Sequence, residues 1–166
     1  MDEFRLKITI HSVQIDIPQS IKMVVQTVYK NQTQQTSQKC KLSVVQAVKM
    51  SDQTEQTDFK IADFKNQELY LNVKVDSNIQ YISEHLSKME HLPKLKPNEV
   101  EQKCSIKLMA VSEDKSKLIG IVNYSFYPRD KAFEVLKRHT LRFTKSIDNN
   151  SSICISSELQ PIKVFT

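Results

Sequence analysis

Lysines at strand-like positions are the side chains of this sequence that could bind a ligand. Each has neighbours in the chain that are expected to face the core, so the lysine itself should face solvent. They are Lys39, Lys41, Lys49, Lys74 and Lys107. A basic side chain near an anionic leaflet contributes about 1 kcal/mol, so four or five would give weak, salt-sensitive binding. A polar face that only keeps the protein soluble has the same pattern, and both interpretations stay open.

Carboxylates at the predicted loops are too few for a calcium site. Calcium takes six to eight oxygen ligands, so several carboxylates must converge. The first loop offers Asp16 alone, and a later loop offers the adjacent pair Glu113 and Asp114 beside Lys115 and Lys117. These lysines repel a cation and neutralise the carboxylates. We therefore expect neither a calcium site nor any other metal site.

The spacing of histidine and glycine predicts no catalytic residues and no cofactor. His85 and His91 lie six positions apart, whereas a helical metal-binding pair lies four apart. No serine lies in a nucleophile elbow, and no Cys–His pair follows from spacing. The single glycine, Gly120, excludes glycine-rich loops that hold phosphates or dinucleotides. We expect that the protein is not an enzyme.

A basic cluster near the C-terminus could suggest nucleic acid. It comprises Lys137, Arg138, His139, Arg142 and Lys145. No aromatic platform accompanies these residues, and arginine is rare in the chain. We interpret the cluster as the end of a helix, where the dipole favours cations, and do not expect a nucleic-acid partner.

The composition is typical of one cytoplasmic domain. Of the 166 residues 39% are hydrophobic and 26% charged, and no apolar run reaches the length of about 20 residues that spans a bilayer. The segment Met1–Arg5 lacks the features of a signal peptide. Three dispersed cysteines, Cys40, Cys104 and Cys154, are expected to be unpaired, buried apolar residues. The net charge of +5 permits an anionic partner without requiring one.

Alternating hydrophobicity predicts about eight strands, spaced as in a sandwich. Phe4, Leu6, Ile8 and Ile10 alternate with polar residues, which is typical of a half-buried strand. Residues 31–38 are predicted to form a polar connection. The other candidate strands are Ile21–Tyr29, Cys40–Val44, Thr57–Phe64, Leu69–Val75, Cys104–Ala110, Leu118–Phe126 and residues 153–165.

Two helices are expected to interrupt the strands. A capping box at Ser77–Gln80 opens a helix over residues 78–91 within a helical insertion, residues 76–100, and Pro93 ends it. One face of this helix is a candidate for docking a partner, with Ile79, Ile82, Leu86 and Met89. A second, short helix over Lys131–His139 is capped by Asp130 and should turn Phe133 and Leu136 inward.

The order of these elements resembles a C2 domain of the N-terminal C2 type. The resemblance rests on Leu6–His11 followed by Ile17 and Pro18, on Lys117–Phe126 with its central Gly120, and on Ile153–Ser156. The tryptophan that the family usually carries is absent. The resemblance implies an all-β fold, an eight-stranded antiparallel C2-like β-sandwich with one inserted helix and one short helix. It would form a single domain over residues 1–166, at the N-terminal part of a longer protein.

The resemblance leaves two functions open. The first is a calcium-independent C2-like interaction module that anchors or scaffolds a larger intracellular protein, of cytoskeletal, ciliary, centriolar or basal-body type, through a protein partner. The second is a peripheral membrane module, because some C2 domains gather phosphoinositide headgroups on the sheet face that Lys39, Lys41 and Lys74 would share. We favour the first, because the net charge is small and the predicted loop tips are polar.

Overall fold

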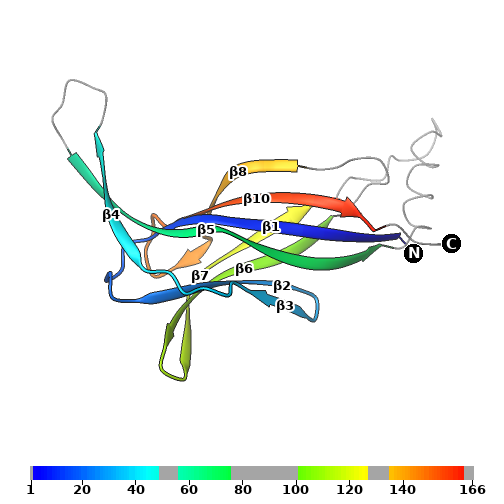
Figure 1. The fold of residues 1–166 in the computed structure, drawn as a ribbon, viewed down its shortest axis with the longest axis horizontal. Coiled ribbons are helices and arrows are strands. Elements are labelled where there is room, and N and C mark those ends of the chain that lie inside the picture. The colour runs from blue at the N-terminus through cyan, green and yellow to red at the C-terminus, as the bar shows by residue number, and fades with distance from the viewer. Residues whose placement is uncertain (1, 49–55, 76–100, 127–134, 163–166) are drawn as a thin grey trace.

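The structure of the chain is a computed structural model that describes residues 2–48, 56–75, 101–126 and 135–162. The described part contains ten β-strands and no helix (Figure 1). In chain order they are β1 (Asp2–Gln14), β2 (Lys22–Tyr29), β3 (Gln32–Gln35), β4 (Leu42–Val48), β5 (Gln56–Val75), β6 (Gln102–Ser112), β7 (Lys115–Phe126), β8 (Val135–Arg142), β9 (Lys145–Ser146) and β10 (Ser152–Pro161).

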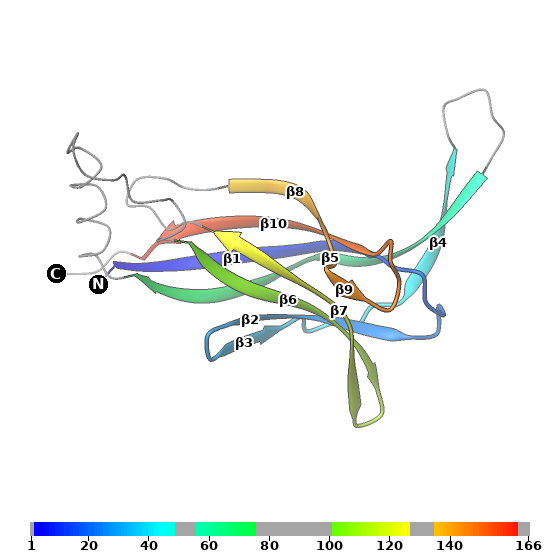
Figure 2. The same cartoon turned by 180° about the vertical axis from the view of Figure 1, so that it is seen from behind.

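The strands form two five-stranded sheets with antiparallel pairing, as the alternating pattern predicted. The first sheet has the order β4-β5-β1-β10-β8 and the second has the order β3-β2-β6-β7-β9. In both views the first sheet lies above the second, and the β6–β7 hairpin projects below the body (Figures 1 and 2). The two sheets therefore make a sandwich with β1 at the centre of one layer.

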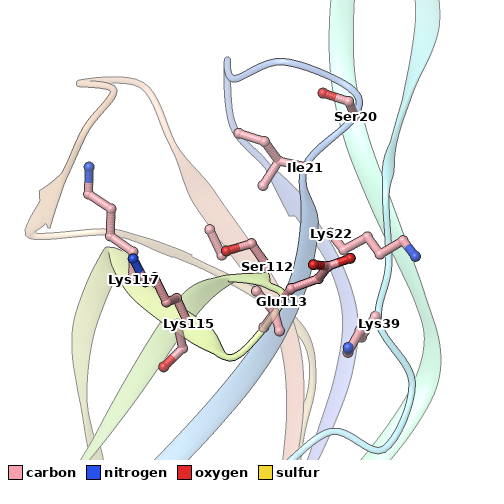
Figure 3. Close-up of a pocket in the computed structure, with 11 residues that line it drawn as sticks. Ser20, Ile21, Lys22, Lys39, Ser112, Glu113, Lys115 and Lys117 are labelled. Carbon is pink, nitrogen blue, oxygen red and sulfur yellow. The ribbon is translucent and has the colours of Figure 1, made fainter.

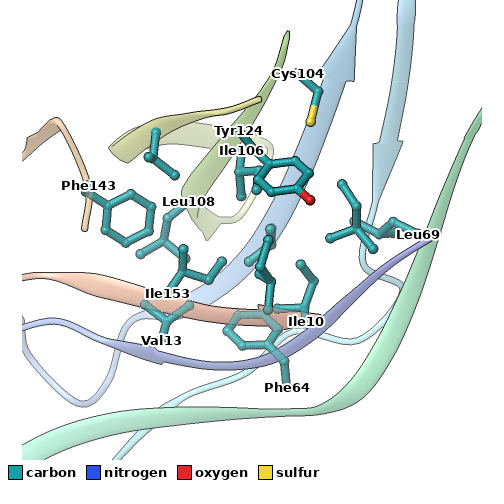
Figure 4. Close-up of a cluster of buried hydrophobic side chains, with 14 of the residues drawn as sticks. Ile10, Val13, Phe64, Leu69, Cys104, Ile106, Leu108, Tyr124, Phe143 and Ile153 are labelled. Carbon is teal, nitrogen blue, oxygen red and sulfur yellow. The ribbon is translucent and has the colours of Figure 1, made fainter. Parts of the chain in front are cut away.

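The core lies between the sheets, because alternate side chains of each strand point inward. Leu6, Ile8 and Ile10 of β1 face Ile106 and Leu108 of β6, and each of the five is at most 1% exposed. Figure 4 shows Ile10, Ile106 and Leu108 of this cluster together with Phe64 and Phe143. Full burial of one such side chain stabilises the fold by about 1.5–3 kcal/mol.

Gly120 of β7 allows an aromatic ring to approach the backbone. A β-carbon at this position would lie 3.2 Å from two ring carbons of Phe143, which is closer than ordinary van der Waals contact. Phe143 follows β8 and is 7% exposed. The glycine thus has a packing role, since the ring covers the place that a side chain would take.

Strand β5 joins two strands that the sequence predicted separately, Thr57–Phe64 and Leu69–Val75. Between them Lys65 and Asn66 have φ values of 55° and 56°, in the left-handed region. Asp63 holds this turn, because its carboxylate accepts the Lys65 N–H at 2.8 Å. The result is a bulge and not a strand end, since both halves stay paired with β1.

Strand β3 occupies residues predicted as a polar connection. Its four residues pair with the end of β2, and only Gln32 among them is partly buried. The Gln32 amide accepts the backbone N–H of Asn72 at 2.9 Å and donates to its carbonyl at 2.6 Å. The Gln32 side chain thus makes the pair of hydrogen bonds that a backbone residue would make in a strand ladder. These bonds link β3 to β5.

The prediction of a short helix over Lys131–His139 is wrong for the residues of this range that the structure describes. Val135–His139 belongs to β8, which pairs with β10, while Asp130 and the first residues of the predicted helix lie outside the described ranges. Leu136, expected to face inward from a helix, lies opposite Ser157. Pairing with β10, which follows in the sequence, overrides the helical preference that the local spacing of apolar residues indicates. Tertiary context commonly overrides local propensity in this way.

Other predictions concern residues outside the described ranges. They are the inserted helix within 76–100, with Ile79, Ile82, Leu86 and Met89, and also Phe133 and Lys49. Among the described residues, no helix has the length and apolar content needed to cross a membrane.

A line of irregular pairings crosses four strands of the first sheet. The register of β1 shifts at His11 toward both neighbours, and that of β10 with β8 shifts at Ser156. His11 Nδ1 lies 2.6 Å from Asn66 Oδ1 on β5, and Nε2 lies 2.5 Å from Ser156 Oγ. Ser156 Oγ also accepts the backbone N–H of Arg138 on β8 at 2.9 Å. This chain of hydrogen bonds fixes the bulges relative to one another.

The cysteines are unpaired, and two of the three are buried as predicted. Cys154 is only half-buried, because it lies on the outward side of β10 between buried Ile153 and Ile155. Burial raises the pKa of the Cys104 thiol to about 12, and burial followed by the nearby Asp63 charge raises the pKa of Cys40.

We predict that Cys104 resists alkylation in the folded protein. With a pKa of about 12, about one thiol in ten thousand is ionised at pH 8, and the thiolate is the reactive form. Because the folded pKa lies above the unfolded value, this stabilising contribution is complete below about pH 9 and is lost as the pH rises toward 12. Peptide mass spectrometry after iodoacetamide treatment should find Cys104 modified only in denaturant. Rapid modification in the native state would contradict the burial.

Candidate functional site

A hollow of about 590 Å³ lies beside the β6–β7 hairpin (Figure 3). Four lysines line it, with one glutamate, Glu113, and with serines and small apolar groups between them. We call it the lysine hollow, after Lys22, Lys39, Lys115 and Lys117. Figure 3 shows Lys22, Lys39 and Glu113 on one side of it, and Lys115 and Lys117 on the other.

Backbone hydrogen bonds bring the first two lysines together. A turn in which the Ile21 N–H donates to the Pro18 carbonyl at 3.2 Å leads into β2, so Lys22 is its first residue. The next residue, Met23, exchanges two backbone hydrogen bonds with Cys40, at 2.8 and 2.9 Å. The segment between β3 and β4 is thus tied to the start of β2, which places Lys39 beside Lys22.

The hairpin supplies the other two lysines. Val111 of β6 pairs with Lys22, so the hairpin extends past the start of β2. Its two-residue turn contains Asp114 at φ 59°, a conformation that aspartate tolerates. Lys115 and Lys117 follow on β7 and point to the same side, because they are two residues apart on a strand.

The positive charge of the lysine hollow is incompletely balanced. Four lysines and one glutamate line it, an excess of three charges, and Asp114 lines the adjoining hollow at the hairpin turn. In the described part of the chain the ion pairs join Lys7 to Glu68, Lys60 to Asp16 and Lys74 to Glu3, and none involves the hollow. Ammonium groups donate three hydrogen bonds each, so the hollow can accept an anionic oxygen group such as phosphate.

Solved structures resemble the whole sandwich. A C2 domain of a plant extended synaptotagmin 1 superposes with a TM-score of 0.51 over 96% of both chains, at 10% sequence identity. The chain has a C2-like fold. Two further structures, of CC2D1B and of a C2 domain, have TM-scores of 0.44 at 11% and 7% identity, over 93% and 96% of this chain and 54% and 99% of theirs. No family model and no curated protein sequence matches the chain.

This C2-like sandwich does not gather the lysines proposed from the sequence. Lys39 lines the hollow and Lys41 is exposed nearby, but Lys74 lies near the far end of β5, 3.7 Å from Glu3. The segment that carries Lys39 lies beside Gln67 of β5, since the Gln38 N–H donates to Gln67 Oε1 at 3.0 Å, and Lys74 is seven residues further along the strand, roughly 23 Å at about 3.3 Å per residue. Lys107 lies in the other sheet, half-buried between β2 and β7.

Three members of the lysine hollow were missed as binding residues. The sequence presents Lys115 and Lys117 only as groups that repel calcium, and it marks no role for Lys22. The hydrogen-bonded bridge between Met23 and Cys40 is what joins them to Lys39, and it spans 17 positions of sequence. The alternation of apolar and polar residues along one strand does not indicate a contact between two distant segments.

Asp16, the loop carboxylate considered as a calcium ligand, forms an ion pair with Lys60. The Lys60 ammonium lies 3.0 Å from Asp16 Oδ1 and 3.2 Å from the Ile17 carbonyl oxygen. Asp148 is engaged by the backbone N–H of Asp16 at 3.0 Å. Among the described residues there is no group of three or more side chains suited to a metal. Calcium independence stays a prediction, and Lys60 supports it because a calcium ion would have to displace this ammonium.

The contacts of His11 resemble those of a catalytic triad, with Ser156 in the place of the nucleophile, His11 in that of the base and Asn66 in that of the orienting group. The carboxamide oxygen of Asn66 accepts, so Nδ1 of a neutral His11 carries the proton and Nε2 accepts from Ser156. A neutral amide stabilises an imidazolium poorly, and Ser156 Oγ already accepts the Arg138 N–H. Because the three residues join the bulges of the first sheet, a structural role accounts for the arrangement.

Proposed function

We propose that this C2-like domain is a calcium-independent, non-enzymatic module that attaches to an anionic membrane surface through the lysine hollow. The observation that carries the proposal is the convergence of four lysines from three chain segments around one hollow with a single carboxylate. At about 1 kcal/mol for each basic residue near an anionic leaflet, the hollow would supply roughly 3–4 kcal/mol.

The shape of the lysine hollow favours a phosphorylated headgroup over a diffuse charged surface. Its volume of about 590 Å³ admits a small ligand, and Ser20, Ser112 and Ser116 add hydroxyl groups between the lysines. Ile21 and Val111 contribute apolar surface beside them. Phosphoinositides present several phosphate charges on one ring, which matches the excess charge of the hollow. Anionic lipids are concentrated in the cytoplasmic leaflet, so the proposal includes a cytoplasmic location at a membrane surface.

The alternative proposal, that the domain anchors a longer cytoskeletal, ciliary or centriolar protein through a protein partner, rests on a different surface. The exposed basic residues Lys137 and Arg138 of strand β8, which do not line the hollow, favour it.

Co-sedimentation with liposomes tests the proposed function. We expect the domain to bind vesicles of phosphatidylcholine with phosphatidylserine and phosphatidylinositol bisphosphate equally well with calcium and with a chelator. Binding should weaken by about tenfold or more from low to physiological salt, because the ammonium groups are exposed and screened. Vesicles of phosphatidylcholine alone are the control. Absence of binding at low salt would reject the proposal, and a requirement for calcium would reject its calcium independence.

A further inference from the structure

The basic cluster near the C-terminus needs a new explanation. A helix dipole cannot favour Lys137, Arg138 and Arg142, because all three lie in strand β8. The sequence from residue 135 to residue 147 contains no aspartate or glutamate. None of the three forms an ion pair with another described residue. The cluster is therefore an uncompensated positive strip along one strand.

Strand β8 is an edge strand, and its stretch from Lys137 to Thr140 is exposed on both faces, whereas Leu141 packs against the core. It is the last strand of the first sheet and pairs with β10 alone in the described part of the chain. Four consecutive residues, Lys137, Arg138, His139 and Thr140, are exposed. An edge strand that covers a core would bury every second residue, so this stretch of β8 covers none.

The backbone of β8 is held in place beneath its exposed basic side chains. Arg138, at φ 46°, donates its N–H to Ser156, and beyond this bulge His139 to Arg142 pair with β10 in regular register. Arg142 donates to the carbonyl of Asn149 at 3.3 Å and to Asn150 Oδ1 at 3.2 Å, both neutral groups. The outer edge from His139 to Arg142 is thus a preformed row of backbone donors and acceptors.

We propose that this edge binds an acidic segment of a protein partner, which adds as a further antiparallel or parallel strand beside β8. Main-chain hydrogen bonds would supply affinity and the basic side chains would select the partner. Two copies of this chain would not pair here, because like charges would face one another. Nucleic acid fits less well, since Lys137–Thr140 and Arg142, the exposed residues in the described part of β8, include no phenylalanine, tyrosine or tryptophan on which bases could stack.

This strip and the lysine hollow are separate surfaces. In both views β8 lies along the upper edge of the sandwich, whereas the β6–β7 hairpin projects from its lower side (Figures 1 and 2). A domain seated on a membrane by the hollow would turn β8 away from the lipid. The two proposals can therefore fail or succeed independently.

Fluorescence anisotropy with synthetic peptides tests the inference. The probe is a labelled eight-residue peptide of alternating glutamate and valine, at physiological salt. We expect sub-millimolar binding, and binding weaker by about tenfold or more when alternate peptide nitrogens are methylated. Methylation keeps the charge but removes the backbone donors, so it separates strand addition from simple attraction. Equal binding of both peptides, or no binding up to about 1 mM, would overturn the proposal.

Variants locate the binding. Lys137→Glu with Arg138→Glu changes two exposed residues whose side chains make no hydrogen bond to another described residue, and should weaken peptide binding by about tenfold or more. Lys115→Glu with Lys117→Glu makes the same change of charge at the lysine hollow and should leave peptide binding within about twofold. Equal loss in both pairs would place the peptide elsewhere. A single-stranded oligonucleotide that displaces the peptide at much lower concentration would overturn the choice of an acidic protein segment.

Discussion

Replacing Lys22 and Lys39 with glutamate should reduce binding to anionic liposomes by at least about a hundredfold. Both side chains are exposed and line the hollow from adjacent segments that a pair of backbone hydrogen bonds joins. Each reversal removes about 1 kcal/mol of attraction and adds repulsion of similar size, so the pair costs about 3–4 kcal/mol. Vesicle titration at low salt gives the ratio of the two affinities.

The matched control makes the same change of charge at positions outside the lysine hollow. Lys103→Glu with Lys137→Glu changes the net charge equally at two exposed positions that do not line the hollow. We expect this pair to weaken liposome binding by no more than about fivefold, through the overall charge. An equal loss in both pairs would mean that net charge, and not the lysine hollow, governs the attachment.

Replacing Phe64 with alanine should lower the free energy of unfolding by about 3–5 kcal/mol, the largest stability effect that we expect from one side chain. Phe64 is 0% exposed and contributes to the core immediately before the left-handed pair Lys65 and Asn66. The loss combines the transfer free energy of the ring with the cost of the cavity that remains, because the packed core relaxes only partly around the gap. Urea denaturation gives the value, and an unchanged m-value would show that only stability changed.

Phe59→Ala is the comparison for this variant. Phe59 lies on the same strand, opposite Val45 of β4, but is only half-buried. We expect it to cost about 1–2 kcal/mol, in proportion to the smaller area that leaves water. Equal costs at the two positions would contradict the placement of Phe64 in the core.

Sequence reasoning reached the strands that cover the core and missed those that do not. Alternation from Phe4 to Ile10 and from Ile153 onward predicted β1 and β10, because both strands bury one face. Strand β3 has almost no buried residue, so its glutamines carry no alternation. Strand β8 resembled a helix, since its pairing with β10 depends on residues that follow it in the chain.

The sequence predicted which type of side chain forms the candidate site, but not which residues come together there. Exposed lysines and sparse loop carboxylates were visible in the sequence, and Lys39 was among the residues proposed. Its partners became evident only from the Met23–Cys40 bridge and from the pairing of Lys22 with Val111. The resemblance to a C2 domain predicted that Lys74 shares a sheet face with Lys39 and Lys41, whereas β5 carries Lys74 to the end of the strand, beside Glu3.

The central position of β1 has a consequence for synthesis on the ribosome. One neighbour of β1 in the sheet, β5, follows within the first half of the sequence, but the other, β10, is the last of the described strands to be translated. At about 5–20 residues per second, β1 waits on the order of ten seconds for that partner. During this interval the edge that β10 will cover is open to other nascent chains. Chaperone binding to translation intermediates should therefore persist until residue 161 has left the ribosome.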